Sequence, residues 1–246
     1  MLLLLAALVL VWGLVARFGP WPPYVLPGPW RVAQAFARGL AEGTFLVGLS
    51  VTLRRLLLGY GLSVACGLAF GLLVGRVRQA DEALGPLLLG FQTLPSICWL
   101  PLAILWFGLG ETAILFVVVM GATLAIAIHT ADGVKNIPRL YVRAAENLGA
   151  SGLRLFVSVL LPAAFPAFLS GAKTGWSFAW RSLMAAEMIF VSLGLGQLLA
   201  AARELNDVAQ VMAVMLLIVC VGVAVDWLVF QSLERRVRRA WGFISS

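Results

Sequence analysis

Residues 136–166 read NIPRLYVRAAENLGASGLRLFVSVLLPAAFP. This stretch decides the predicted fold, because it lies between two long apolar segments and is still rich in charge. Its four charged side chains give a polar density found nowhere else inside the hydrophobic body of the chain: Arg139, Arg143, Glu146 and Arg154.

The first half of the stretch predicts one short helix. Asn136 can cap its start, and Pro138 lies just inside, where a missing N–H costs nothing. Gly149 is placed to end the helix in a left-handed conformation. At 3.6-residue spacing the apolar and small side chains share one face, with the charges turned away: Leu140, Tyr141, Ala144, Ala145 and Leu148.

The second half predicts another short helix. Ser151 can cap it, it continues to about Pro162, and Pro166 is expected to break the chain again. Two short helices joined at a glycine between apolar segments are typical of a docking platform. A solvated loop that only connects two spans is the alternative, and the small side chains beside the glycine argue against it.

The composition is that of an integral membrane protein. The 246 residues are 62% hydrophobic and only 12% charged, with a mean hydropathy of +0.99, whereas soluble domains are about one quarter charged. A helix that crosses a membrane needs ~20 apolar residues. We therefore expect an all-α fold with about six transmembrane helices, at about residues 2–16, 44–74, 84–107, 114–130, 167–191 and 208–230.

The segments between the spans carry interfacial and basic residues. Residues 17–43 predict an external turn followed by an amphipathic helix over 30–40 at the membrane interface. Residues 192–207 predict an external loop or half-helix, and 233–246 form a basic tail. The first apolar segment lacks the charged start and the cleavage site of a signal peptide, so we expect it to span the membrane.

Two sets of small residues suggest packing. Gly67, Gly71 and Gly75 form a track of small side chains that permits tight contact between membrane helices. The three cysteines lie far apart in apolar stretches and are expected to be small core residues, with no disulfide or metal site: Cys66, Cys98 and Cys220. His129 is expected to be a satisfied buried or interfacial histidine.

The third predicted span is interrupted by prolines, and polar side chains gather at the middle one, Pro95. A helix broken inside a membrane is tolerated only where protein or a water-filled cavity satisfies the freed carbonyls. These polar residues and the tryptophan after them are therefore candidates for a solute path: Gln92, Thr93, Ser96 and Trp99.

The fifth predicted span adds further candidates. Ionisable groups at membrane depth cost a few kcal/mol each and should face a partner or a cavity. We therefore also assign Arg181 and Glu187 to the solute path, together with Trp176 and Trp180, which lie one helical turn apart. The alternative is that the two tryptophans pack as core, that Arg181 and Glu187 satisfy each other or an interfacial partner, and that Lys173 reaches towards the cytoplasm. Both interpretations stay open.

Basic residues predict the orientation. With both ends inside, the predicted cytoplasmic segments 76–82, 132–155 and 234–246 carry ten of the eighteen Lys and Arg, and the external segments carry four. This asymmetry places the 136–166 stretch and both termini in the cytoplasm. The net charge of +7 is explained in the same way, and we expect no nucleic-acid partner.

The chain lacks the motifs of an enzyme. There is no phosphate-binding GxxxxGK[ST] loop, and no GxSxG or HExxH motif. We therefore expect that this chain is not an enzyme, and that any ATP on which it depends is hydrolysed by another chain.

The central stretch resembles a known motif. Residues 144–162 carry an alanine pair, three residues, Gly149, nine residues and then VLLP, which is similar to the cytoplasmic EAA motif of ABC-importer permeases. Arg143 stands where that motif usually has Glu, and Val159 where it usually has Ile. The resemblance implies a loop that fits a groove on an ATPase subunit, with these docking residues: Arg143, Ala144, Ala145, Glu146, Gly149, Ala150, Ser151 and Pro162.

Most of the chain, over residues 44–232, resembles the nitrate, sulfonate and taurine branch of these permeases. The resemblance rests on TLRRLLLGY from Thr52, LPLAILWFG from Leu100 and AEMI from Ala186. It implies a type I ABC-importer permease fold made of an N-terminal helix and external segment (1–43), a permease core (44–232) with the coupling loop (136–166), and a basic tail (233–246).

The resemblance also implies partners and a mechanism. The expected assembly is a homodimer in the lipid of a bacterial plasma (inner) membrane, with two ATPase subunits and an external or periplasmic solute-binding protein. ATP and Mg would be bound by the ATPase, with no cofactor in this chain. The solute would pass by alternating access. An ATP-independent anion channel or transporter, or a structural membrane protein, is the alternative.

Overall fold

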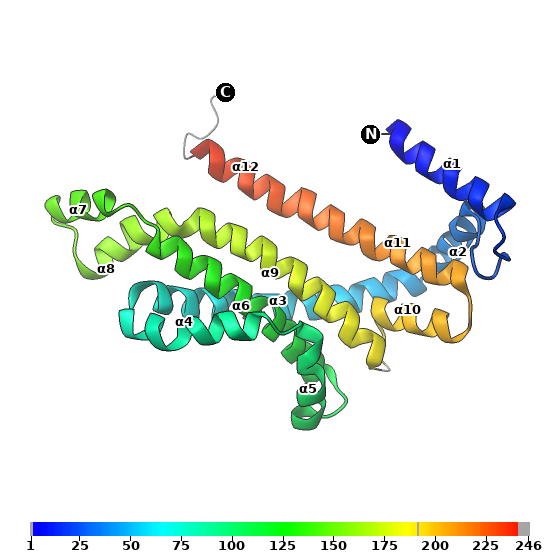
Figure 1. Ribbon diagram of the computed structural model, residues 1–246, viewed down its shortest axis with the longest axis horizontal. Helices are drawn as coiled ribbons and strands as arrows, with labels where there is room; N and C mark the ends of the chain where they lie inside the picture. The colour runs from blue at the N-terminus through cyan, green and yellow to red at the C-terminus, as the bar shows by residue number, and fades with distance from the viewer. Residues whose placement is uncertain (1, 191, 241–246) are drawn as a thin grey trace. The chain divides into compact units, whose positions relative to one another are not determined.

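The computed structural model describes residues 2–190 and 192–240, and every element in these ranges is helical. The chain forms two compact units. Unit 1 joins the chain up to Arg54 with Met184–Val223, and unit 2 joins Arg55–Leu183 with the chain from Ala224. The elements, labelled in Figure 1, are α1 (Leu2–Phe18), α2 (Pro29–Ala41), α3 (Thr44–Arg76), α4 (Arg78–Gln92), η1 (Ser96–Trp99), α5 (Leu100–Phe107), α6 (Glu111–Lys135), α7 (Arg139–Asn147), α8 (Gly152–Leu155), η2 (Phe156–Leu160), α9 (Leu161–Ile189), α10 (Leu195–Glu204), α11 (Val208–Val225), η3 (Asp226–Phe230) and α12 (Gln231–Ala240).

Fewer helices are long enough to span a membrane than the six we predicted. Among the described residues four qualify by length and apolar composition, or up to five if the bent pair α4 and α5 counts as one span. The predicted first apolar helix is present as α1, whose 17 residues place it among the shorter apolar helices rather than the four.

In unit 1 the predicted amphipathic helix is present as α2, which buries Val32, Ala35 and Gly39 on one side. Gly39 is small because the Phe45 ring lies directly over it. The indole N–H of Trp12 in α1 donates to the Pro27 carbonyl at 3.1 Å. The predicted external half-helix is α10, while residue 191, at the end of the predicted fifth span, lies outside the described residues.

The glycine track packs α3 against α6 in unit 2 and is confirmed as a close helix contact. A Cβ on Gly67, Gly71 or Gly75 would strike α6 at residues 126, 130 and 134, respectively. Both series of positions rise together in steps of one helical turn, so α3 and α6 run parallel. Glycine is needed here because the two backbones approach too closely for a side chain.

The segment between these parallel helices, α4 to α5, has to bring the chain back across unit 2. Its two halves are bent by 102° at the break after Gln92. The predicted interruption at Pro95 is therefore confirmed, but as a sharp corner rather than a kinked rod. Because α3 and α6 run in the same direction, we count the bent pair as one return passage, which gives five passages from α3 to α11 among the described residues.

α6 and α9 run antiparallel, with Gly133 against Ala167 and Gly171 against His129. The predicted chain break at Pro166 is wrong, because one continuous helix extends from residue 152 to 189. The turn η2, just before Pro162, is π-helical, and the N–H of Leu161 bonds to the Phe156 carbonyl five residues back. This wider turn relieves the clash and the missing donor that a proline otherwise imposes.

The expectation for the cysteines is wrong. The cysteines are exposed thiols rather than core residues: Cys66, Cys98 and Cys220. In a chain that spans a membrane, exposed apolar positions face lipid or another protein, so an apolar sequence context does not predict burial inside the chain. His129 is half-buried. The basic tail begins as the helix α12, which continues the last span, and residues 241–246 lie outside the described residues.

Candidate ATPase-docking surface and solute path

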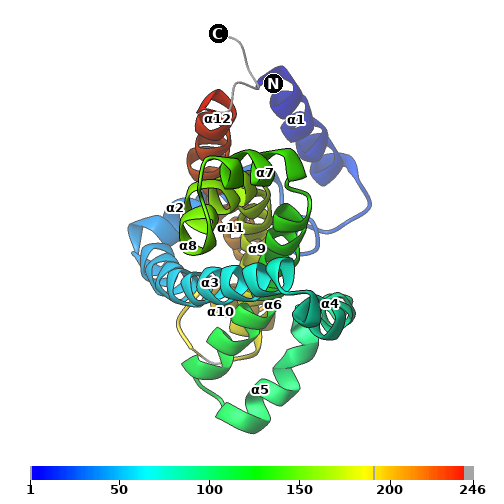
Figure 2. The same cartoon turned by 90° about the vertical axis from the view of Figure 1, so that its left-hand side faces the viewer.

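The predicted docking stretch forms a helical hairpin, α7 and α8, between α6 and α9 in unit 2 (Figures 1 and 2). α7 ends in a turn built on Gly149, whose φ of +83° lies in the left-handed region. The N–H of Gly149 bonds to the Glu146 carbonyl and that of Ala150 to the Ala145 carbonyl, both at 2.9 Å. These two bonds form a Schellman motif, which satisfies the last carbonyls of the helix. The predicted glycine stop is confirmed.

The caps of the hairpin differ from the prediction. Asn136 is the C-terminal cap of α6, and α7 starts one residue after Pro138. The predicted cap at Asn136 is therefore wrong, because the proline sets an extended backbone that delays the helix. Ser151 does hold the N-cap position of α8, but its side chain makes no capping bond.

The hairpin exposes apolar side chains. Leu148 is 88% exposed, Leu153 is 76% exposed and Leu140 is 72% exposed. A Cβ on Gly149 would meet no atom within 4 Å, so the open surface extends over the turn itself. Six of the predicted docking residues are exposed and two, Ala145 and Ala150, are half-buried; the exposed ones are Arg143, Ala144, Glu146, Gly149, Ser151 and Pro162. Exposed apolar surfaces of this kind mark sites that bind another protein or the membrane.

The predicted solute path begins at the corner between α4 and η1. Gln92 is the last residue of α4, and the Thr93 hydroxyl donates to the Gly90 carbonyl at 2.7 Å. Ser96 lies 2.7 Å from the Ser182 hydroxyl of α9, which is also 2.7 Å from the Phe178 carbonyl. Ser182 has one proton, so both contacts are made together when it donates to Phe178 and accepts from Ser96.

The corner is held tightly to its neighbours. A Cβ on Gly121 of α6 would collide with Ser182 Oγ and lie 3.1 Å from Ser96 Cβ, so a side chain there would displace the contact between these two serines. Trp99 packs edge-on against Phe91 and Phe116, with ring centroids 5.7 and 6.4 Å apart. The polar residues of the corner thus lie next to an aromatic cluster in the same unit.

The tryptophans of α9 are packed inside unit 2. Trp176 and Trp180 stack with an interplanar angle of 11° and centroids 6.4 Å apart, and each is less than a tenth exposed. Tyr60 meets Trp176 edge-on at 5.3 Å and donates its hydroxyl to the Ala172 carbonyl at 2.8 Å. Phe230 closes the cluster from η3. In this conformation both indoles belong to the core of the unit.

The charged candidates have separate environments. Arg181 is exposed; its Nε donates to the Ser177 carbonyl at 3.0 Å, and its guanidinium lies 4.9 Å from the Phe178 ring. One alternative was that Lys173 reaches towards the cytoplasm. In the structure its ammonium pairs with Asp226 at 3.1 Å and Glu234 at 3.5 Å. Sequence reasoning found no partner for Lys173, although acidic residues in and after an apolar helix are the signal for one.

Glu187 lies in unit 1, and the structure turns its carboxylate inward. The side chain is 0% exposed and accepts from the Thr52 hydroxyl at 2.8 Å and the Gly196 N–H at 3.0 Å. The Thr52 oxygen in turn accepts from the Leu195 N–H at 2.9 Å. A Cβ on Gly194 would collide with the carboxylate, so the loop can come this close only through glycine. Thr52 is the residue that sequence reasoning missed.

Residues 67–239 match the model of one protein family, described as the binding-protein-dependent transport system inner membrane component. The match includes the hairpin, the corner and α9. The chain belongs to this family. It is therefore a membrane-spanning permease subunit of an ABC importer, a transport subunit without its own ATPase, and its family works with ATPase and solute-binding partners.

Relatives match nearly the whole permease. It is 33% identical to SsuC of Escherichia coli, named as an aliphatic sulfonates transport permease protein, over 93% of this chain and 86% of the relative. It is 30% identical to the E. coli taurine transport system permease protein TauC, over 95% and 86%. A chain from inward-facing structures of the methionine ABC transporter MetNI has a TM-score of 0.69 at 20% identity, covering 80% of this chain and 97% of that one, which confirms the fold.

Proposed function

We propose that this permease imports a small sulfonate-type organic anion, as a homodimer driven by two ATPase subunits that dock on α7 and α8. The observation that carries the coupling proposal is the Gly149 turn, which presents Leu148 and Leu153 at 88% and 76% exposure. Burying a leucine in a partner's groove contributes about 1.5–3 kcal/mol, so these two side chains would supply part of the docking energy. The substrate class is supported by the relatives named for taurine and sulfonates.

The orientation that we propose is supported by unit 2 and the positive-inside rule. Because α3 and α6 run parallel, their ends lie on the same side, together with Arg76, Lys135 and the hairpin. Basic residues favour the cytoplasm at that side, where an ATPase binds its ATP and Mg. If α3 begins outside, five passages place α12 in the cytoplasm. If α1 also crosses the membrane, the N-terminus would lie in the cytoplasm as well.

Large apolar side chains remain exposed along the spans, among them Leu57, Leu62 and Phe70 of α3 and Val219 and Val223 of α11. Surfaces of this kind face lipid or a second copy of the chain in a membrane. This supports the homodimer and the lipid contacts that we propose.

For the solute path we propose the corner residues Gln92, Thr93 and Ser96 and the exposed Arg181. A guanidinium suits a sulfonate because it presents several N–H donors to several oxygens. Trp99, Trp176 and Trp180 would line the solute path only in a different conformation of the transporter that uncovers them. Glu187 would act by holding α10 in place rather than by meeting the solute.

Replacing Gly149 by Val tests the docking proposal. A side chain in the left-handed region costs about 1–2 kcal/mol and would also protrude from the docking surface, so the variant should insert normally but lose co-purification with the ATPase. Gly61→Val is the matched control, because a Cβ there meets nothing within 4 Å and its φ is ordinary. Unchanged assembly and ATP hydrolysis in the Gly149 variant would refute the proposal.

The solute proposal is tested by ATP-driven uptake in vesicles that hold the permease with its ATPase and binding protein. Arg181→Gln should lower taurine or sulfonate uptake at least tenfold while leaving ATPase binding intact. Arg181→Lys, which keeps the charge, should retain part of the uptake. Normal uptake by both variants would exclude Arg181 from the path, and uptake without ATP would favour a channel.

Cysteine labelling tests the orientation. A cysteine at the exposed Ser151 should react only with reagents that cross the membrane, and one at Leu205, which is 76% exposed, with impermeant reagents added outside. The three native cysteines are exposed and must first be changed to alanine to remove their signal. The reverse labelling pattern would overturn the proposed topology.

A further inference from the structure

A pocket of about 490 Å³ lies between α4 and α6 within unit 2, and its lining residues are distinct from those assigned to docking and to the solute path. Its two walls are stripes on facing helices. Residues 81, 85, 88 and 89 recur on one face of α4, and residues 128, 131, 132 and 135 do so on α6. Gly85 keeps the space open beside the Asp81 carboxylate.

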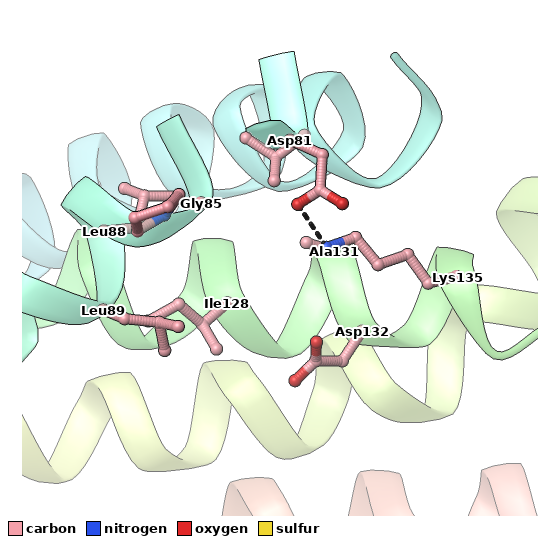
Figure 3. A pocket seen from close by; sticks show the side chains of 10 residues that line it. Asp81, Gly85, Leu88, Leu89, Ile128, Ala131, Asp132 and Lys135 are labelled. Carbon is pink, nitrogen blue, oxygen red and sulfur yellow. Dashed lines mark hydrogen bonds and ion pairs between the residues drawn. The ribbon is translucent and has the colours of Figure 1, made fainter. Parts of the chain in front are cut away.

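The two ends of this pocket differ in character. Figure 3 shows Leu88, Leu89 and Ile128 together at one end, and Asp81, Asp132 and Lys135 at the other. The pocket therefore offers an apolar compartment that leads to a charged one, the pattern that binds a ligand with an apolar chain and an ionic head.

The charged end of the pocket has hydrogen-bonding groups that can bind a ligand. Lys135 Nζ pairs with Asp81 Oδ1 at 2.5 Å, and an ammonium has three donors, so two remain. Asp132 is exposed, and within residues 2–190 and 192–240 its carboxylate has no hydrogen bond or ion pair. Two carboxylates and one ammonium leave the pocket with an excess of negative charge, which favours a ligand that carries a cationic group beside an anionic one.

The pocket lies where apolar spans end. Arg76 is in the last turn of α3, two residues after the lining residue Val74, and Lys135 is in the last turn of α6. Charged residues at the ends of membrane helices lie at the level of the lipid headgroups. The apolar end of the pocket then faces the acyl chains and the charged end faces the headgroups.

We propose that this pocket binds phosphatidylethanolamine. The primary ammonium of its headgroup would donate to Asp132, its phosphate would accept from the free donors of Lys135, and one acyl chain would lie against Leu88, Leu89 and Ile128. A choline headgroup has no N–H to donate to the carboxylate, and an anionic glycerol headgroup is repelled by the two aspartates. The site is independent of ATPase docking and of the solute.

Native mass spectrometry of the full-length permease in detergent can test this. Phosphatidylethanolamine, phosphatidylcholine and phosphatidylglycerol with identical acyl chains are added in equal amounts, and retained lipid is counted. We expect ethanolamine lipid to bind about tenfold more tightly than choline lipid, the ratio that one charge-assisted hydrogen bond supplies. Equal retention of the two lipids would overturn the proposal.

Variants separate this site from general lipid contact. Asp132→Asn should reduce ethanolamine-lipid binding to the level of choline lipid, whereas Glu204→Gln, an exposed carboxylate outside the pocket, should not. Leu89→Trp fills the apolar end without touching a charge, and it should weaken retention of ethanolamine lipid as well. A preference that survives both pocket variants would place the lipid elsewhere and refute the site.

A free zwitterion with the same groups is the competing ligand. Taurine also carries a primary ammonium and an oxyanion, but it is too small to use the apolar end. Added taurine should therefore leave lipid retention unchanged. Displacement of the lipid by taurine, abolished by Asp132→Asn, would assign the pocket to the solute and overturn the lipid proposal.

Discussion

The α7–α8 hairpin and the surroundings of Glu187 use the same kinds of residue in opposite ways. In the hairpin, Gly149 makes a local turn and leaves Leu148 open to solvent. Around Glu187, two glycines close the backbone over a charged side chain that is completely buried. The hairpin is thus organised by bonds between neighbours in sequence, and the Glu187 site by bonds between α3, α9 and α10.

This difference indicates which parts can change partners. A helical hairpin that satisfies its own carbonyls can keep its shape while a partner comes and goes. The Glu187 site cannot, because a buried carboxylate needs all its donors at once. The first region suits docking and the second suits holding a fixed arrangement within unit 1.

Removing the buried carboxylate should have the largest effect on stability. Glu187→Ala leaves the Thr52 hydroxyl and the Gly196 N–H without their acceptor and opens a cavity, at a cost of about 3–5 kcal/mol. Thermal unfolding in detergent should show a clear loss. Glu204→Ala, at an exposed position of α10, should unfold like the wild type. Equal stability of all three proteins would mean that the buried site does not hold α10.

The hairpin should respond in the opposite way. Leu148→Ser removes an exposed side chain, so unfolding should not change, but ATPase binding should weaken by about 1.5–3 kcal/mol, roughly tenfold or more in Kd. The Kd can be measured between surface-immobilised permease and purified ATPase. Leu105→Ser is the matched control, since that leucine is 77% exposed on α5. If Leu148→Ser instead lowers stability, the hairpin is part of the core.

A smaller effect is expected at the corner. Ser182→Ala removes the hydroxyl between Ser96 and the Phe178 carbonyl, and one hydrogen bond contributes about 1 kcal/mol net. Unfolding should therefore shift slightly, and uptake should change more than stability if Ser96 lies on the solute path. Ser177→Ala on the same helix, where the hydroxyl is exposed and reaches only the Lys173 carbonyl, is the control.

The smallest effect is expected for the ion pairs of Lys173. Its side chain is about a third exposed, at 34%, so water screens the contacts with Asp226 and Glu234. Lys173→Met should change the free energy of unfolding by about 0.5 kcal/mol or less, with a smaller difference still at high salt. A loss as large as that of Glu187→Ala would show that these pairs hold α9 to the last span.

Much of the fold was predictable where the cause is local. The Gly149 turn, the amphipathic α2 and the glycine track of α3 each follow from a backbone or spacing rule that needs no knowledge of the partner. The effect of the prolines was harder to predict, because a proline inside a helix can either break it or be accommodated within it. At Pro95 the helix turns a sharp corner. At Pro162 it continues through a π-helical turn, and at Pro166 it continues as α-helix.

The sequence by itself determined that this is a helical membrane protein with a helical hairpin at Gly149 and with motifs that resemble those of ABC-importer permeases, since apolar length and the spacing around Gly149 are properties of the chain read in order. Only the tertiary structure decided which polar groups meet. Thr52 and Glu187 are 135 residues apart, and Ser96 and Ser182 are 86 apart. No sequence period pairs residues at such separations, because helix packing sets those contacts. The same packing decided that Trp176 and Trp180 lie in the core while the cysteines face outward.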